Sequence, residues 1–356
     1  MKRIAVSVIA VLILLSGCAP RDAARTETFF AMDTVVTSTA YGNDAGTALM
    51  NIRELSSGYD SYLSVTDPGS AVSLANASGG RALSDAENGE ALLLVADALE
   101  MSDLTGGAFD ITIYPVVRAW GFTTDENRVP PPEELAELMQ STGFRRVEIS
   151  RGPAKQVAFP EKMAVDLGAA TKGYVGDRLN IIMNQYDASA VINLGGDVIT
   201  HGQKPDGSDW RIAVRDPAGE DYFGVVSVEG GCAVMTSGGY ERYFTGEDGR
   251  VYHHIIDPST GYPADSGLVS VTVVASGSRC GFYADAISTA AFVMGKDSAL
   301  EFRRGLGGRI SLGAEPSGAD FDLILVTDGG EVVITKGLEG RFELTSAAYT
   351  LVVAED

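Results

Sequence analysis

The chain has 356 residues, of which 45% are hydrophobic and 21% charged, and its formal net charge is −21. Such a composition is typical of a globular protein with enough apolar material for a sizeable core. Nucleic-acid binding requires a positive surface, so the strong acidity excludes nucleic acid as a partner. The same acidity means that a phosphate-bearing ligand needs local compensation by a lysine, a helix N-terminus or a metal ion.

The first residues have the pattern of an export signal. Lys2 and Arg3 precede an unbroken run of apolar or small residues over 4–15, which is too short to span a membrane as a stable anchor. The Leu-Ser-Gly-Cys sequence that follows ends at Cys18 and resembles the bacterial lipobox. We therefore predict that residues 1–17 are a cleaved lipoprotein signal peptide and that the Cys18 thiol is lipidated. The protein is then expected to be exported and held by its lipid at the outer face of the bacterial membrane; a plain signal peptide with a chance cysteine is the alternative.

The rest of the chain divides into a short tether and one catalytic unit. Residues 18–28 are mostly small and polar, as in a tether between a lipid and a domain. No linker interrupts residues 29–356, so we predict a single catalytic unit there. Two further cysteines, Cys232 and Cys280, either pair in an exported protein or remain two free buried thiols.

Helical and β-rich patterns follow one another irregularly along this unit. In chain order, we expect a strand at 29–41 and helices at 44–60, 86–102, 133–140 and 171–185. We then expect short strands at 190–193, 210–215, 225–228, 233–236 and 269–274, a helix at 282–294 and a hairpin over 322–335. Because regular βαβ alternation is absent, we predict an α+β fold with mixed, largely antiparallel sheets and packed helices.

Five segments combine Gly or Ala with polar side chains that are able to bind oxygen. They are Gly-Gly-Ala-Phe-Asp at 106–110, Asp-Leu-Gly-Ala-Ala-Thr-Lys-Gly at 166–173, Asn-Leu-Gly-Gly-Asp at 193–197, His-Ile-Ile-Asp-Pro-Ser-Thr-Gly at 254–261 and Ala-Asp-Ala-Ile-Ser-Thr-Ala at 284–290. Clustered glycines of this kind indicate tight turns and close approach of the backbone to a ligand.

The last of these segments contains a candidate metal site. Asp285 and Thr289 are four residues apart in a predicted helix, so both side chains lie on one face. A carboxylate and a hydroxyl are hard oxygen ligands that suit Mg²⁺. The same spacing also occurs by chance on solvated helix faces. Here the flanking alanines indicate a buried helix, and a buried Asp needs a partner or an ion, which favours the metal.

Two other segments are candidates for phosphate or ring binding. Residues 166–173 have the pattern of a strand that ends in a Gly-rich turn and opens a helix, where backbone amides meet an anion and Lys172 adds a charge. An ordinary helix start with Thr171 as N-cap is the alternative. For residues 193–197, the alternatives are a Gly-lined ligand surface and a plain hairpin turn.

A histidine supplies the candidate for proton transfer. His254 is one of three histidines, with His201 and His253, and it precedes a sharp polar turn that contains Asp257. Imidazole is suited to proton transfer near neutral pH, so His254 is the first candidate base and Asp257 the second. A structural histidine is the alternative. The sequence has neither the Gly-x-Ser-x-Gly elbow of a serine hydrolase nor a Cys/His spacing typical of zinc.

Taken together and in this order, the segments resemble the ApbE family of FAD:protein FMN transferases. The resemblance extends from Met32 to the region of Lys336, and it includes Trp-Gly-Phe at 120–122 and Ser-Gly-Gly-Tyr at 237–240. It implies an ApbE-like, T-fold-like architecture and Mg²⁺-dependent transfer of FMN from FAD to a Thr or Ser hydroxyl of an acceptor protein. The product would be a phosphoester, AMP would leave, and a subunit of a membrane redox complex is the kind of acceptor implied.

The resemblance also assigns roles to individual residues. The positions that contact FAD in the family match Met32, Thr66, Ala108, Phe109, Asp110, Asp166, Lys172 and Ile256. The metal ligands match Asp285 and Thr289, with the backbone carbonyl of Ala169 completing the set. His254 matches a position that is important for transfer.

Three positions depart from the family pattern. Thr66 stands where members often carry a Tyr against the flavin, which implies looser stacking of the ring. Asp33 stands where Gly is common, and Lys172 stands where some members have Glu. Two other functions share the same pocket: hydrolysis of FAD to FMN and AMP, and binding of FAD without catalysis. The candidate metal ligands and base favour catalysis over binding alone.

Overall fold

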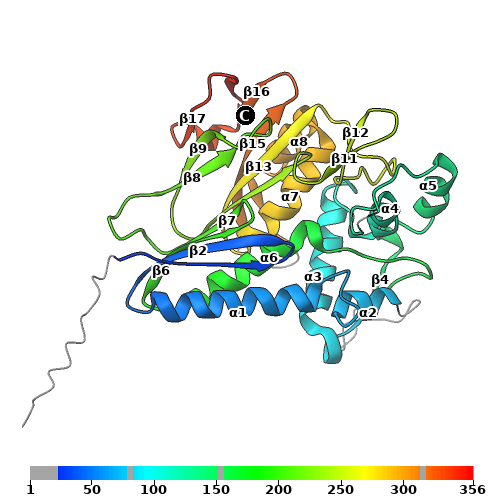
Figure 1. Cartoon of the computed structure of the whole chain (residues 1–356), viewed down its shortest axis with the longest axis horizontal. Helices are drawn as coiled ribbons and strands as arrows, with labels where there is room; N and C mark the ends of the chain where they lie inside the picture. Colours follow the sequence, from blue (N-terminus) through cyan, green and yellow to red (C-terminus); the bar gives the residue numbers. More distant parts are fainter. Residues whose placement is uncertain (1–22, 78–82, 125, 151–155, 313–317, 356) are drawn as a thin grey trace, which may run out of the picture.

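The computed structural model describes residues 23–77, 83–124, 126–150, 156–312 and 318–355 (Figure 1). The predicted signal peptide and Cys18 lie outside these ranges. Within them, none of the helices combines the length and the apolar character that a membrane crossing requires.

A large twisted sheet forms the centre of the fold. Its strands run in the order β1-β2-β6-β7-β10-β13-β15-β16-β18, and β14 also pairs with β15. All these neighbours are antiparallel except β16 and β18, which are parallel. The predicted α+β fold with a largely antiparallel sheet is therefore confirmed. The strands are β1 (Arg25–Ala31), β2 (Thr34–Gly42), β6 (Ala188–Leu194), β7 (Asp197–His201), β10 (Cys232–Gly238), β13 (Leu268–Gly277), β14 (Arg309–Ile310), β15 (Ala319–Thr327), β16 (Glu331–Ile334) and β18 (Thr350–Val353).

Helices cover one face of this sheet (Figure 1). Helix α1 (Ala45–Leu63) packs on β1 and β2, α6 (Gly168–Met183) packs on β7, and α7 (Cys280–Met294) packs on β10 and β13. Helices α6 and α7 also pack closely against each other. The remaining long segments of this layer are α2 (Ala71–Ala77), α3 (Asp85–Leu104) and α8 (Lys296–Gly305).

The opposite face carries a second, smaller sheet. It contains β8 (Trp210–Arg215), β9 (Tyr222–Val228) and β17 (Phe342–Leu344) in the order β17-β9-β8. In β10, Ala233 and Met235 belong to the core under the helices, whereas Val234 belongs to the core under the small sheet. This alternation is the period of two that a strand imposes, and it explains why the central strands are buried on both faces. A third sheet joins β3 (Leu83–Ser84), β5 (Gln156–Ala158) and β4 (Glu148–Ser150).

A small lobe stands beside the end of the helical layer, at the right of Figure 1. It consists of α4 (Tyr114–Trp120), α5 (Pro132–Met139) and the hairpin of β11 (Tyr243–Thr245) and β12 (Val251–His253). Its own core joins Val116, Trp120, Leu135 and Ile256. Short 3₁₀ segments complete the fold: η1 (Ile111–Ile113), η2 (Phe144–Arg146) and η3 (Lys336–Leu338).

The expected single strand at 29–41 is wrong in one respect. The chain reverses at Met32 and Asp33, both with φ 55°, and forms the hairpin of β1 and β2. Two successive left-handed residues define a tight hairpin turn that usually contains Gly or Asn, so the sequence carried no clear turn signal. β1 begins at Arg25, so the last four residues of the segment expected as a tether are paired in the sheet.

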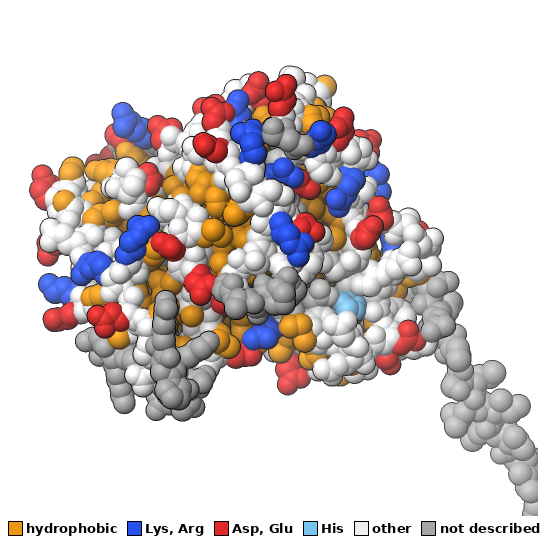
Figure 2. All heavy atoms as spheres, turned by 180° about the vertical axis from the view of Figure 1, so that it is seen from behind, with side chains coloured by type: hydrophobic (Ala, Val, Ile, Leu, Met, Phe, Trp, Pro, Cys, Tyr) orange, Lys and Arg blue, Asp and Glu red, His pale blue; other side chains and the backbone are white. Residues whose placement is uncertain are grey.

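On the face seen in Figure 2, the acidic side chains are not concentrated in one place. Asp and Glu side chains are interspersed there with Lys and Arg side chains and with exposed apolar atoms. The excess of negative charge therefore acts on ligands mainly as a general field, and local cations decide where an anion binds.

Candidate active site

Two glycines bring helices α6 and α7 into backbone contact. A Cβ on Gly173 would lie 2.1 Å from the carbonyl oxygen of Gly281, and a Cβ on Gly281 would lie 2.3 Å from the carbonyl oxygen of Gly173. Asp177 fixes the start of α7, because its carboxylate accepts hydrogen bonds from the amides of Gly281 (2.8 Å) and Phe282 (2.9 Å). Such a carboxylate at a helix N-terminus satisfies free amides and complements the helix dipole. The two helices therefore have a fixed relative position.

The predicted metal ligands lie on the two helices of this contact, Ala169 on α6 and Asp285 and Thr289 on α7. Asp285 lies in α7 and is 5% exposed, and Oδ2 of its carboxylate accepts a hydrogen bond of 2.8 Å from the amide of Gly173. Ala169 lies one helical turn before Gly173 in α6. Thr289 lies one turn further along α7, and its hydroxyl is 3.1 Å from Oγ of Ser237.

The three predicted ligands suit a hard divalent cation. A carboxylate, a hydroxyl and a backbone carbonyl are oxygen ligands of the kind that Mg²⁺ prefers. Over the described part of the chain, the amide of Gly173 is the one hydrogen-bond donor found for the Asp285 carboxylate. Burial, aided by the nearby Asp197, raises the pKa of Asp285 to about 7 although Lys172 opposes the shift. Burial disfavours the ionised form of this carboxylate, so a bound cation would stabilise that form strongly. No cluster of three or more His, Cys, Asp or Glu side chains suited to a metal occurs in the ranges given above.

Lys172 is the fixed cation of the site. Its ammonium forms an ion pair with Asp197, whose side chain is 3% exposed. Burial alone lowers the pKa of Lys172, but Asp197 and Asp285 more than offset this effect and raise it. The lysine is therefore charged at all working pH values. The helix starts at Gly168, three residues before the expected position, and Thr171 lies inside it, with its hydroxyl bonded to the carbonyl of Leu167.

The segment at 193–197 is a hairpin turn with a role in the site. Gly195 (φ 72°) and Gly196 (φ 106°) form the turn between β6 and β7, and Oδ1 of Asn193 accepts a hydrogen bond of 2.7 Å from the amide of Gly196. A Cβ on Gly195 would lie 2.0 Å from the hydroxyl oxygen of Thr34, so the turn packs directly on the β1–β2 hairpin. The hairpin turn is thus confirmed, whereas the Gly-lined ligand surface stays a prediction, and the turn delivers Asp197 to Lys172.

The turn at Met32 and Asp33 lies at the same end of the sheet. Asp33 is 3.7 Å from the guanidinium of Arg242 in an exposed ion pair. Asp166 is close to both: burial raises its pKa, whereas Arg242 lowers it and Asp33 raises it. Oδ1 of Asp166 also accepts a hydrogen bond of 2.8 Å from the amide of Gly168 at the start of α6. Of the predicted FAD contacts, Asp166 therefore lies near the turn at Met32 and Asp33, and Lys172 lies near the predicted metal ligand Asp285.

The remaining predicted FAD contacts differ in how they face this site. The Asp110 carboxylate is occupied by Thr112 (2.8 Å from the amide and 2.7 Å from the hydroxyl) and by the amide of Phe144 (3.1 Å). Phe109 is 2% exposed, so its ring belongs to the core. Only the main chain of this residue can contact a ligand. Ala108 is half-buried against the same core. Thr66 is exposed in the turn before α2 and hydrogen-bonded to Ser64.

The two adjacent histidines have different surroundings. His253 uses both ring nitrogens: Nε2 is 3.1 Å from the carbonyl of Ala264, and Nδ1 accepts from the amide of Ile255 at 3.3 Å. His254 uses one: Nδ1 is 3.2 Å from the carbonyl of Arg242, so this nitrogen carries the proton and donates it. Nε2 of His254 is then a free base in the described structure. Burial, with help from Arg242, lowers the pKa of His254 to about 3, so the ring is neutral near neutral pH.

Asp257 is mainly a turn residue. Its Oδ1 accepts from the amide of Ser259 at 2.8 Å, and its carbonyl accepts from the amide of Gly261 at 2.9 Å. The carbonyl of Gly261 in turn accepts from the indole of Trp120 at 2.9 Å. Ile256 precedes this turn and is buried in the core of the small lobe. The geometry therefore favours His254 over Asp257 as the proton acceptor.

The two cysteines of the catalytic unit are free and buried. The thiol of Cys280 lies 3.6 Å from the carbonyl of Gly231. Burial raises the pKa of both thiols, so they are inert core side chains rather than reactive groups.

Comparison with known proteins agrees with this geometry. The sequence pattern of the ApbE family matches residues 32–310. The chain belongs to the ApbE family. It is 33% identical over 260 residues to a FAD:protein FMN transferase of Haemophilus influenzae, a match that covers 71% of this chain and 70% of the relative. A FAD:protein FMN transferase of Treponema pallidum is 32% identical over 274 residues, covering 72% and 71%. The crystal structure of the ApbE protein of Thermotoga maritima has a TM-score of 0.79 at 33% identity, covering 90% of this chain and 99% of that one.

Sequence reasoning missed three charged residues that organise this ApbE-family site. Asp197 belonged to a recognised segment, but a motif does not show that its carboxylate meets Lys172. Arg242 follows the Ser-Gly-Gly-Tyr segment and contacts both His254 and Asp33. Asp177 looked like an ordinary helical residue, and its only signal was its distance of one helical turn from Gly173.

Proposed function

We propose that this ApbE-family transferase moves the FMN half of FAD to a Thr or Ser hydroxyl of an acceptor protein. In this reaction the acceptor oxygen forms a bond to the phosphorus that carries riboflavin, and the bond from that phosphorus to the bridging oxygen breaks. AMP leaves with the bridging oxygen, and FMN remains on the acceptor as a phosphoester. The hydroxyl proton needs an acceptor on the enzyme.

His254 is suited to take that proton. Its Nδ1 is held by the carbonyl of Arg242 at 3.2 Å, which fixes the tautomer and leaves the lone pair of Nε2 free. Its lowered pKa keeps the ring unprotonated before the reaction. A base with so low a pKa takes up a proton only as the hydroxyl oxygen bonds to phosphorus, because that oxygen becomes strongly acidic at this point.

Asp285, Thr289 and the carbonyl of Ala169 would hold Mg²⁺. When bound, the ion would neutralise charge on the phosphate oxygens and orient them. The observation that carries the proposal is the position of Asp285: a buried carboxylate that accepts one hydrogen bond, from the amide of Gly173, at the contact between α6 and α7. A protein that only stores FAD does not require a buried carboxylate of this kind.

The test is incubation of the enzyme with FAD, Mg²⁺ and a Thr-containing exported subunit of a membrane redox complex, followed by intact mass measurement. A gain of one FMN on the subunit, with one AMP released, supports the proposal. Free FMN and AMP without labelling would instead identify a FAD pyrophosphatase that uses water as the acceptor. Unchanged FAD would identify a flavin-binding lipoprotein without catalysis.

We also propose that the enzyme is exported and anchored through a lipid on Cys18. The support comes from the sequence of residues 1–18, which lies outside the described ranges. Six residues separate Cys18 from the start of β1 at Arg25. At about 3.4 Å per residue, a segment of this length keeps the domain within about 25 Å of the lipid, which suits an acceptor embedded in the same membrane.

A further inference from the structure

Three hydroxyl groups form a hydrogen-bonded chain at the predicted metal ligands. The hydroxyl of Ser237, near the end of β10, lies 2.8 Å from that of Ser288 and 3.1 Å from that of Thr289, both on α7. Ser288 in turn donates a hydrogen bond of 2.8 Å to the backbone carbonyl of Asp285. The chain therefore starts at one predicted metal ligand, crosses to the sheet and returns to the backbone of the other ligand.

The position of Ser237 follows from the alternation of side chains along β10. Met235 belongs to the core under the helices, so Ser237, two residues later, also points toward the helical layer. Ser237 and Thr289 are half-buried, whereas Ser288 is 0% exposed. A fully buried hydroxyl depends on partners within the protein, so the two hydrogen bonds of Ser288 belong to the packed structure.

The backbone carbonyl at the end of the chain sets the direction of every bond in it. A hydroxyl has one proton to donate, and a carbonyl oxygen only accepts. Ser288 uses its proton on the carbonyl of Asp285, so it must accept from Ser237. Ser237 has then used its own proton and must accept from Thr289. The Thr289 hydroxyl is therefore a donor to Ser237, and the lone pairs of its oxygen stay free for a cation.

The chain also removes an alternative position for the Thr289 proton. A Thr hydroxyl inside a helix can donate to the carbonyl four residues earlier, and for Thr289 that carbonyl belongs to Asp285. This carbonyl accepts a helical amide as well, so the bond from Ser288 takes its second lone pair. Over the part of the chain that the structure describes, Ser237 is the hydrogen-bond partner found for the Thr289 hydroxyl.

We propose that Ser237 and Ser288 are positioning residues for metal binding, which orient the Thr289 hydroxyl so that its lone pairs rather than its proton face the cation. The inference rests on the proposed function, because it takes Thr289 as a ligand of Mg²⁺. The family resemblance assigns no role to either serine. Loss of a group that orients a metal ligand usually lowers metal affinity by about 10–100-fold. Since one ligand of three is affected here, we expect a loss of about tenfold.

The test follows the Tm of the full-length protein during a titration with MgCl₂, in the absence of FAD and acceptor. Ser237→Ala and Ser288→Ala should each raise the half-maximal Mg²⁺ concentration by about tenfold. In a Thr289→Val background neither substitution should raise it further, because the serines act only through the Thr289 hydroxyl. A general loosening of the helix contact would instead add to the effect of Thr289→Val.

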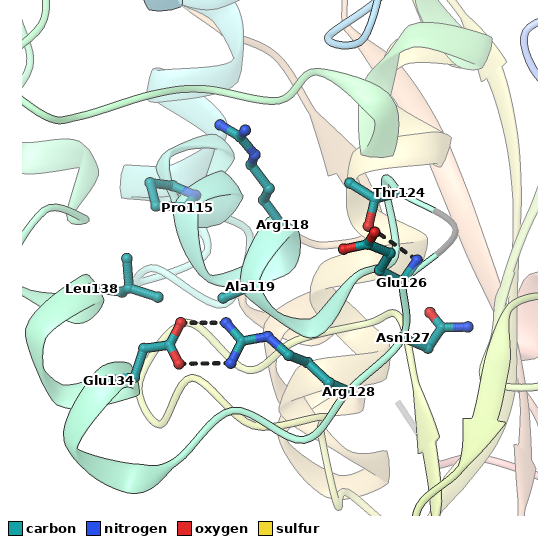
Figure 3. A pocket seen from close by; sticks show the side chains of 9 residues that line it. All are labelled: Pro115, Arg118, Ala119, Thr124, Glu126, Asn127, Arg128, Glu134 and Leu138. Atoms are coloured by element: carbon teal, nitrogen blue, oxygen red, sulfur yellow. Dashed lines mark hydrogen bonds and ion pairs between the residues drawn. The ribbon is translucent and has the colours of Figure 1, made fainter.

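Two hydroxyls elsewhere provide controls. Thr272 of β13 is 1% exposed and pairs with Thr236 at 2.8 Å, on the face of the sheet away from α7. Thr272→Val should therefore lower the Tm and leave the half-maximal Mg²⁺ concentration unchanged. Thr124 lines a pocket of about 510 Å³ in the small lobe and donates to the carbonyl of Gly121 at 3.4 Å (Figure 3). Thr124→Val should change neither quantity.

Several results would overturn the proposal. An unchanged half-maximal Mg²⁺ concentration in both serine variants would do so, and so would an equal rise in either control or a further rise in the Thr289→Val background. A wild-type Tm that does not respond to Mg²⁺ would also overturn it. FMN transfer to an acceptor is read separately by intact mass. Serine-dependent Mg²⁺ binding without transfer would support the positioning role and remove the proposed reaction, whereas transfer with serine-independent Mg²⁺ binding would do the reverse.

Discussion

Replacing Gly173 by Ala tests whether the contact between α6 and α7 builds the site. Gly173 has an ordinary helical conformation, so alanine is compatible with its backbone and would favour a free helix. Only the space around it is restrictive, because the Gly281 backbone and the Asp285 side chain lie against it. The substitution therefore adds one methyl group and changes nothing else in the local chemistry.

The size of the effect follows from the distances. The new Cβ would lie 2.1 Å from the Gly281 carbonyl oxygen and 2.7 Å from Cβ of Asp285, whereas non-bonded heavy atoms prefer about 3.5 Å. The helices must separate by about 1 Å, and overpacking of this kind costs about 1–3 kcal/mol. Asp285 would move away from the amide of Gly173 by a similar distance. Misplacement by about 1 Å lowers catalysis by about 100-fold.

Thermal unfolding and turnover of FAD measure the two effects. We expect Gly173→Ala to lower the Tm by about 2–12 °C and the rate of transfer by about 100-fold. Gly58→Ala is the control, because a Cβ there meets no atom within 4 Å on α1 and should stabilise the protein by about 0.5–1 kcal/mol. Wild-type Tm and rate in Gly173→Ala would refute the view that helix contact positions Asp285.

Other substitutions separate the roles of the site residues. Asp285→Asn should abolish the rise in Tm caused by Mg²⁺. It should also stabilise the metal-free protein at about pH 8, because the wild-type carboxyl has its pKa raised to about 7 and its contribution to stability is lost as the pH rises through that value; a persisting Mg²⁺ effect would place the metal elsewhere. His254→Ala should slow transfer by about 10²–10⁴-fold with FAD affinity retained. With the pKa of His254 lowered to about 3, the wild-type rate should show no loss due to this group between about pH 8 and pH 5, and an imidazole titration in that range would contradict the structure. His253→Ala should instead lower the Tm with little effect on the rate, since both its ring nitrogens are bonded. Cys18→Ser should move the protein from the membrane fraction to the soluble one, and unchanged fractionation would exclude the lipid anchor.

The elements that could be predicted are those with strong local patterns. The expected helix at 282–294 corresponds to α7 (Cys280–Met294), and the expected strand at 210–215 corresponds to β8. In both, the pattern of buried residues follows directly from the apolar residues of the segment. The turn at Met32 was not predictable, because its left-handed residues are Met and Asp rather than Gly. Tertiary contact with Gly195 and Arg242 holds that conformation.

The sequence could predict which residues belong to the site, but it could not predict how their charges interact. Helical spacing alone places Asp285 and Thr289 on one face of α7, and in the structure Asp285 is buried and Thr289 half-buried. The pairing of Lys172 with Asp197 joins residues 25 positions apart and depends on how β7 lies beside α6. The tautomer of His254 depends on the carbonyl of Arg242, and a backbone atom has no sequence signature. Contacts between residues far apart in the sequence therefore determine the charges and the tautomer in the site, and the motifs do not encode these contacts.

The balance of charge around the site has a consequence for flavin binding. At about pH 8, above the raised pKa of Asp285, the cations Lys172 and Arg242 are outnumbered there by the carboxylates of Asp33, Asp166, Asp197 and Asp285. Without Mg²⁺, the pyrophosphate of FAD therefore meets a repulsive field, which adds to that of the whole protein. Raising NaCl from about 20 mM to about 200 mM shortens the Debye length from about 20 Å to below 10 Å, so metal-free FAD binding should become tighter in a flavin-fluorescence titration. With saturating Mg²⁺ the excess negative charge is neutralised, and the salt effect should vanish or reverse. If metal-free binding instead weakens with salt, the two cations dominate the local field, and the need for a metal ion would have to come from the reaction step alone.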